Sequence, residues 1–240
     1  MATFPSARYY QETYRNWAQI FKIMSVLWLV LAMFMTLPLM VLLIERDPDA
    51  PAFAVSLIII LSATLSTWAL TRGVPLELKP WQMFILTAGS WTSISCFASL
   101  PLILGAPQLS FTNAVFESVS AITTTGSTVL VGIENLSDGL KLWRGLMQWM
   151  GGIGIIGISI AVLPLLRSGG MQLFHLESSD RSPEKLIARP GHLASIIAGL
   201  YLGLTCLCAL GYVLSGMSGF DAVLHALTTV STGGYLQPTL

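Results

Sequence analysis

The sequence predicts an all-α protein that crosses a lipid bilayer several times. Hydrophobic residues make up 54% of the 240 residues and charged residues only 10%, whereas soluble domains carry about a quarter charged residues. The apolar residues gather in five runs of about the length that a helix needs to span a hydrocarbon core of roughly 30 Å. Two further apolar segments are too short to span and end in hydroxyl residues and glycine. A polytopic membrane protein with re-entrant segments is therefore expected.

The chain divides in order into a polar N-terminus at 1–19, a transmembrane helix hairpin at 20–70, and two longer segments. The first of these, 81–166, contains two spans around a short helix. A polar connection at 167–190 separates it from the second segment, 193–240. The individual spans are expected at 20–44, 51–70, 81–104, 140–166 and 193–214.

The two short segments are similar to each other, and we expect both to be re-entrant. Residues 111–128 read FTNAVFESVSAITTTGST, and residues 220–235 read FDAVLHALTTVSTGGY. The helix expected from Asn113 to Ile122 is about 15 Å long, roughly half of the hydrocarbon core. Asn113 and Asp221 are expected to cap these helices at their N-termini, since both residue types accept backbone hydrogen bonds there.

The loops that follow the short helices are expected to line a path for a cation. Backbone outside a helix is tolerated at membrane depth only where it lines water or is buried in protein. Inward carbonyls can then replace the water shell of an ion, beside the negative end of the helix. The candidate ligands are Thr123, Thr124, Thr125, Gly126 and Ser127 in the first loop, and Val230, Ser231, Thr232, Gly233 and Gly234 in the second.

We align residues 124–127 with residues 231–234, which places Gly126 over Gly233 and makes the second helix one residue shorter from cap to glycine. In this alignment the best candidates for carbonyl ligands are Thr124, Thr125, Ser231 and Thr232.

The distribution of basic residues predicts a cytoplasmic N-terminus. With that orientation, nine Lys and Arg residues lie inside and three lie outside, in agreement with the positive-inside rule. The inner set is Arg8, Arg15, Lys22, Arg72, Lys79, Arg167, Arg181, Lys185 and Arg189, and the outer set is Arg46, Lys141 and Arg144. Lys141 and Arg144 are expected to reach the membrane interface.

Other functional classes find little support. A net charge of zero without a basic block gives no sign of nucleic-acid binding. Cys96, Cys206 and Cys208 lack the spacing of a disulfide framework or a zinc site. No nucleophile, base and orienting group suggest an enzyme, and no cofactor is expected.

A GxGxxG pattern at 152–157, with Glu177 beyond it, matches a dinucleotide fingerprint. Because the pattern lies inside an apolar span, close helix packing is the preferred interpretation. Glu117 is an acid within the first short helix. We expect it to hydrogen-bond back to the loop, although a place at the pore mouth is the alternative. His225 is expected to occupy a comparable place in the second segment.

The loop ITTTGST, the run WRGLMQWMGGIGII at 143–156, the run GGMQLF at 169–174 and HALTTVSTGGY together resemble the membrane subunit of Trk-type potassium uptake systems, in the Trk/Ktr/HKT superfamily. The resemblance extends over essentially the whole chain. It implies potassium uptake through a filter of backbone carbonyls in a bacterial inner membrane. In that family a helix hairpin precedes four repeats of span, pore helix, filter loop and span.

By this resemblance, 20–70 is the hairpin, 81–166 the first repeat and 193–240 an incomplete second repeat. Gly126, where related sodium-preferring plant transporters carry serine, favours potassium. The resemblance also implies a homodimer and a cytosolic nucleotide-binding regulatory subunit, for which 167–190 is a candidate contact. Because two filter segments supply only half a ring of carbonyls, this chain alone is not expected to conduct selectively. It is expected to be either a fragment of a longer protein or half of a pore that another chain completes. The alternative is a truncated, non-conducting membrane protein.

Overall fold

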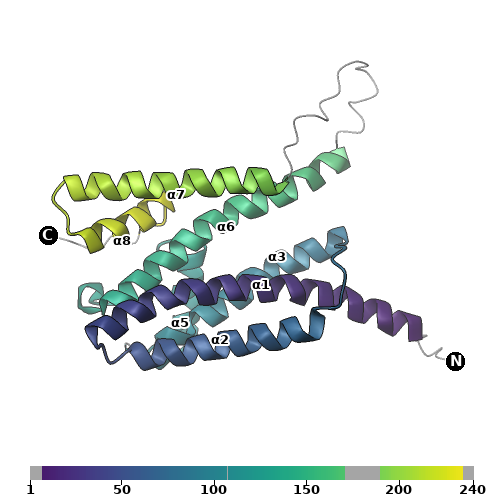
Figure 1. The fold of residues 1–240 in the computed structure, drawn as a ribbon, viewed down its shortest axis with the longest axis horizontal. Helices are drawn as coiled ribbons and strands as arrows, with labels where there is room; N and C mark the ends of the chain where they lie inside the picture. Colours follow the sequence, from purple (N-terminus) through teal and green to yellow (C-terminus); the bar gives the residue numbers. More distant parts are fainter. Residues whose placement is uncertain (1–6, 107, 171–189, 235–240) are drawn as a thin grey trace, which may run out of the picture. The chain divides into compact units, whose positions relative to one another are not determined.

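A computed structural model describes residues 7–106, 108–170 and 190–234, with side chains described from 11 to 157 except 107 and from 194 to 234. Every element in these ranges is helical (Figure 1). The chain forms two compact units, which we describe separately. The first takes the described residues up to Val119 together with Thr128–Trp143, and the second takes Ser120–Ser127 and the described residues from Arg144 onward.

The first unit is built on the long helix α1 (Ala7–Glu45), which continues through Pro38. Helix α1 packs against α2 (Ala50–Thr71) and α3 (Pro80–Ala98), and these helices run side by side in Figure 1. A short helix, α4 (Leu100–Leu104), follows α3 and contacts α2. The predicted N-terminus at 1–19 is therefore helical from Ala7, which extends α1 beyond its apolar run.

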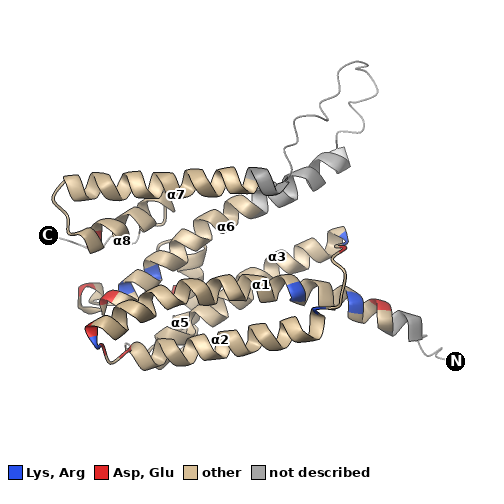
Figure 2. Cartoon of the chain, in the orientation of Figure 1, with Lys and Arg blue, Asp and Glu red and all other residues tan. Residues whose placement is uncertain are grey.

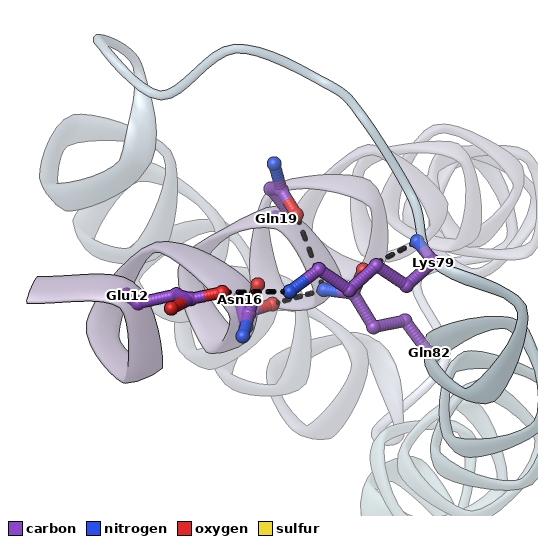
Figure 3. Close-up of polar contacts among 5 residues, drawn as sticks. All are labelled: Glu12, Asn16, Gln19, Lys79 and Gln82. Carbon is purple, nitrogen blue, oxygen red and sulfur yellow. Dashed lines mark hydrogen bonds and ion pairs between the residues drawn. The ribbon is translucent and has the colours of Figure 1, made fainter. Parts of the chain in front are cut away.

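One end of this unit is held together by a network of amide and charged side chains (Figure 3). The fully buried Gln82 donates from Nε2 to the carbonyl of Asn16 at 2.7 Å and to Oε1 of Gln19 at 3.1 Å. Its Oε1 accepts from the backbone N–H of Lys79 at 2.6 Å, as the third helical residue does in a capping box, and so satisfies the N–H before the start of α3. Lys79 also pairs with Glu12 at 2.9 Å. The start of α3 is therefore fixed to the first turns of α1.

The opposite end of the unit carries a tight turn between α1 and α2. The backbone N–H groups of Arg46 and Asp47 donate back to Leu43 and Leu42 at 3.4 and 2.9 Å, the pattern of a Schellman motif with Arg46 in the left-handed region. Asp49 Oδ1 then accepts from the N–H of Ala106 at 2.7 Å, which holds the connection after α4. Figure 2 shows acidic and basic residues at this turn and along the N-terminal part of α1, whereas most of the helical residues are uncharged.

The second unit contains most of α6 (Asp138–Gly170) together with α7 (Pro190–Leu214) and α8 (Gly219–Val230). Helix α8 folds back along α7 after a short turn (Figure 1). The indole Nε1 of Trp149 on α6 donates to Oγ1 of Thr205 on α7 at 3.0 Å, and the hydroxyl of Tyr201 donates to the carbonyl of Trp149 at 3.2 Å. These bonds hold α6 against α7.

Four of the five predicted spans are confirmed as helices that are long and apolar enough to cross a membrane. Within the described residues these are Gln11–Glu45, Ala50–Thr71, Pro80–Leu104 and Ala194–Leu214. The fifth predicted span, 140–166, lies within the 33 residues of α6. The predicted connection at 167–190 and Tyr235 lie largely or wholly outside the described residues, as do Arg181, Lys185 and Arg189.

Candidate functional site

Two short helices of equal length precede the candidate loops. Helix α5 (Phe111–Ile122) and α8 both have 12 residues, which corresponds to about 18 Å and is well short of a bilayer core. The predicted caps at Asn113 and Asp221 are wrong. Ser218 caps α8 by accepting from the N–H of Asp221 at 3.1 Å, and Ser110 makes the equivalent contact with the N–H of Asn113 at 3.4 Å.

The two residues cannot cap their helices because they lie inside the first turn and not before it. Asn113 and Asp221 both lie in the first helical turn, where their own N–H groups need an acceptor and receive one from the serine three residues earlier. Serine hydroxyls accept such bonds as well as asparagine or aspartate does, so residue type alone could not choose between the two candidates.

Both helices end in the same hydrogen-bonded motif. The N–H of Thr124 donates to the carbonyl of Ala121 and that of Thr125 to Ser120, at 3.0 and 2.9 Å. In the second segment, the N–H of Thr232 donates to Thr229 and that of Gly233 to Thr228, at 3.0 and 3.2 Å. This pairing is a Schellman motif, and in each copy its left-handed residue is a threonine.

Left-handed backbone marks both loops at equivalent places. Thr124 and Thr232 have φ of 55° and 57°, and the glycines two residues later, Gly126 and Gly234, have φ of 79° and 63°. The left-handed region is unusual for a β-branched residue and is found mainly at turns and functional sites. Two strained threonines at matching positions therefore point to these loops as the functional part of the chain.

This geometry corrects the alignment of the two loops. Gly126 corresponds to Gly234 and not to Gly233, and Thr124 corresponds to Thr232 and not to Ser231. The helices are consequently equal in length, and the apparent one-residue difference came from aligning Gly126 with the wrong member of a glycine pair. In this register, Glu117 corresponds to His225, which agrees with the place expected for that histidine.

Several loop carbonyls accept no hydrogen bond from any described residue. In the first loop these belong to Thr124, Thr125 and Gly126, and in the second to Thr232 and Gly234. The N–H groups of Thr124 and Thr125, in contrast, are used within the motif. Each loop thus presents acceptors beside the negative end of a helix. No His, Cys, Asp or Glu cluster able to hold a metal ion occurs in the described part of the chain.

The structure brings the two loops into direct contact. A Cβ added to Gly126 would overlap the carbonyl oxygen of Gly233, so a residue with a side chain does not fit there without movement of the second loop. Gly126 therefore has two reasons to be glycine, its left-handed backbone and its approach to Gly233.

Hydroxyl and carboxyl groups brace the first loop. Ser120 Oγ donates to the carbonyl of Ser127 at 2.5 Å, and the hydroxyls of Thr123 and Thr125 are 2.8 Å apart. After the loop, the fully buried Glu117 accepts from Thr128 Oγ1 at 3.0 Å and from the N–H of Val129 at 3.1 Å. The hydrogen-bonding role expected for Glu117 is thus confirmed, and its target is the chain that leaves the loop.

Helix α6 approaches the loops through small residues. A Cβ on Gly151 would overlap the carbonyl of Ile122 at the end of α5, and one on Gly152 would overlap the hydroxyl of Tyr201. Gly157, by contrast, has open space around it. The GxGxxG pattern lies in the middle of a helix and not at a strand-to-helix turn. Close packing is confirmed at its first glycine, Gly152, but not at Gly157.

Two features of buried polar residues on α6 were not predicted from the sequence, namely the burial of Arg144 and the contact made by Gln148. Arg144 is buried, with 3% of its surface exposed, and does not extend to an interface as expected. Gln148 is fully buried and donates from Nε2 to the carbonyl of Gly233 at 3.0 Å. The signal that could have identified Gln148 is a lone amide within an apolar span, because such a group needs a partner.

The comparisons with known proteins agree with this architecture. Residues 49–236 match the family model described as TrkH, cation transport protein. The chain is 61% identical over 224 residues to the Trk system potassium uptake protein TrkI of Halomonas elongata, covering 93% of this chain and 45% of that protein. It is 37% identical over 222 residues to TrkH of Vibrio parahaemolyticus, covering 90% of this chain and 46% of that protein.

The solved structure of the potassium transporter TrkH from Vibrio parahaemolyticus superposes with a TM-score of 0.79 at 33% identity, covering 91% of this chain and 44% of that one. The chain thus spans somewhat less than half the length of the relatives it matches. The apolar helices and these relatives identify an integral membrane protein whose relatives are transport proteins and not enzymes. The chain belongs to the TrkH family of cation transport proteins.

Proposed function

We propose that this chain takes part in potassium uptake and supplies two loops of backbone carbonyls to the ion path. The observation that carries the proposal is the repeated loop geometry, in which a left-handed threonine and a left-handed glycine follow a 12-residue helix. The relatives TrkI and TrkH are named as potassium uptake proteins, which supports potassium as the ion.

The carbonyls proposed to face the ion follow the corrected register. In the first loop they belong to Thr124, Thr125 and Gly126, and in the second to Thr232, Gly233 and Gly234. Thr123, Ser127, Val230 and Ser231 then flank the ligands. Carbonyl oxygens favour a dehydrated cation when their positions are fixed, and the Schellman bonds together with Ser120 provide such fixation.

The proposed orientation places the N-terminus in the cytoplasm. Within the first unit, Lys22 donates to the carbonyls of Arg72 and Val74, beside the network that contains Lys79. Lys141 lies at the start of α6 and pairs with Asp138 at 3.2 Å. The variants Lys79→Cys and Lys141→Cys test the orientation when intact cells are labelled with a membrane-impermeant thiol reagent. Only the cysteine at position 141 should react, because it is proposed to face outward.

A homodimer and a cytosolic nucleotide-binding regulatory subunit are further proposals, drawn from the family resemblance. Co-purification with the regulatory subunit from the same organism, followed by mass measurement of the complex, tests both. The candidate contact at 167–190 is described only as far as Gly170 and again from Pro190.

The proposed function is tested by potassium uptake in a bacterial strain that lacks its own uptake systems. The protein as its gene encodes it should restore growth at low potassium and take up potassium in preference to sodium. Expression in the membrane without any potassium uptake, with or without the regulatory subunit, would favour the non-conducting alternative.

A further inference from the structure

Gln148 joins α6 directly to the second loop. Its side chain is fully buried, and Nε2 lies 3.0 Å from the carbonyl oxygen of Gly233. A Cβ on Gly233 would overlap the amide group of Gln148. The amide is therefore packed against the peptide of Gly233, with no space for another side chain between them.

The carbonyl that Gln148 holds also faces the first loop. The oxygen of Gly233 occupies the position that a Cβ on Gly126 would take. In the corrected register Gly233 corresponds to Thr125, whose carbonyl is a proposed ion ligand. One oxygen thus lies between the amide of α6 and the glycine of the first loop.

Within the described residues, which end at position 234, the second loop shows none of the side-chain bonds that brace the first. In the first loop, Ser120 donates to Ser127, and the hydroxyls of Thr123 and Thr125 meet. Their counterparts in the second loop bond differently. Thr228 Oγ1 donates to the carbonyl of His225 in its own helix, Ser231 donates to the carbonyl of Thr228, and Gly233 has no hydroxyl.

The peptide of Gly233 is also the one most able to turn. It lies between two left-handed residues, Thr232 and Gly234, and glycine itself has the largest range of backbone conformations. Without a side-chain bond its carbonyl could rotate away from the direction that an ion needs. The bond from Gln148 supplies the restraint that the first loop obtains from its own hydroxyls.

We propose that Gln148 is a positioning residue for ion selectivity, because it fixes the direction of the Gly233 carbonyl; this inference rests on the proposed function of the loops. A carbonyl oxygen has two lone pairs, so acceptance from Nε2 leaves one for an ion. Burial strengthens the bond, since the surroundings have a low dielectric constant. The Oε1 atom has no hydrogen-bond partner among the described residues, so the amide acts through its donor.

Two substitutions remove the donor with little change in shape. Gln148→Met keeps the length of the side chain and Gln148→Leu keeps much of its bulk, and neither of these side chains has a donor. The matched control is Thr205→Val. It removes the hydroxyl that accepts from the indole N–H of Trp149, which is the residue after Gln148 on α6. The control loses this part-buried bond and the bond from Thr205 Oγ1 to the carbonyl of Tyr201, and neither bond involves a loop residue.

The experiment measures uptake of potassium and of sodium by each variant, made from the complete gene, in the uptake-deficient strain. Melting temperatures of the purified proteins identify variants that are merely unstable. We expect both Gln148 variants to lose potassium-over-sodium preference by roughly threefold to tenfold, the factor for one ordinary hydrogen bond. Thr205→Val should keep the parent's preference even if its melting temperature falls.

The inference is overturned if Gln148→Met and Gln148→Leu keep the parent's selectivity while Gly126→Ser loses it, since the loops would then be selective without this bond. If the Met variant does not accumulate, Gln148→Asn, whose amide is one methylene short, makes the same comparison. A parent protein that shows no potassium preference at all refutes the proposed function instead, so the two failures are distinguishable.

Discussion

Gly126→Ser is the substitution that most directly tests the role of the loops. Serine at φ of 79° would be strained by about 1–2 kcal/mol, as for other L-residues in the left-handed region. Its Cβ would also overlap the carbonyl oxygen of Gly233, and forcing an atom into a packed site costs typically about 1–3 kcal/mol. The atom that the new Cβ would overlap belongs to the backbone of the second loop. The strain is therefore relieved only if one of the two loops moves.

A movement of either loop displaces carbonyls that are proposed ion ligands, so we expect loss of potassium-over-sodium preference by tenfold or more, the ratio that corresponds to about 1.4 kcal/mol. Uptake of both ions in the deficient strain gives this ratio. Gly157→Ser is the matched control, because that glycine on α6 has open space and an ordinary helical backbone. Equal selectivity in Gly126→Ser and Gly157→Ser would refute the reasoning.

Four further outcomes are expected. Glu117→Gln should retain more transport than Gly126→Ser, because an amide oxygen can still accept one of the bonds from the chain after the loop; equal loss of selectivity in both would contradict this ranking. Gly151→Ala should lower the melting temperature of the purified protein, since its Cβ would overlap a backbone carbonyl at the end of α5, at a cost of about 1–3 kcal/mol. Gln82→Leu should destabilise by at least as much, because the N–H of Lys79 and the carbonyl of Asn16 both lose their bonds, at about 1–3 kcal/mol for each unsatisfied group, but it should leave selectivity unchanged. Gly234→Ala should cause a smaller loss of selectivity than Gly126→Ser, because it meets no described atom and adds only left-handed strain; a larger loss would show that the second loop is the more tightly packed one.

The long helices could be predicted from the sequence because the bilayer dictates their length. A run of about twenty apolar residues has few alternatives to a spanning helix, since every backbone group must be paired internally. The helical extension of α1 before its apolar run could not be predicted in this way, because the bilayer does not dictate the structure of polar residues outside it. Residues between Ala7 and Gln19 carry no apolar run, and their helix is held instead by bonds from Gln82 and Lys79 on α3.

Within the candidate site, sequence identified the loops but not their register. The pair Gly233–Gly234 offers two choices for the partner of Gly126, and composition cannot decide between them. The deciding observation is the backbone of Thr232, whose left-handed conformation matches that of Thr124. Threonine is a residue type for which such a conformation would not be predicted. The partner of Gln148 was equally hidden, since the bond joins residues 85 positions apart.

The left-handed threonines have a cost that glycine would not have. Threonine in this region is strained by about 1–2 kcal/mol, and the chain accepts this strain twice, at Thr124 and Thr232. Glycine would relieve the strain but would also free the peptide to rotate. A filter of the proposed kind needs carbonyls of fixed direction, so a stiff β-branched residue held by Schellman bonds serves it better than a relaxed, mobile one. Gly233 has no stiff side chain of this kind, and at this position Gln148 supplies the restraint from outside the loop.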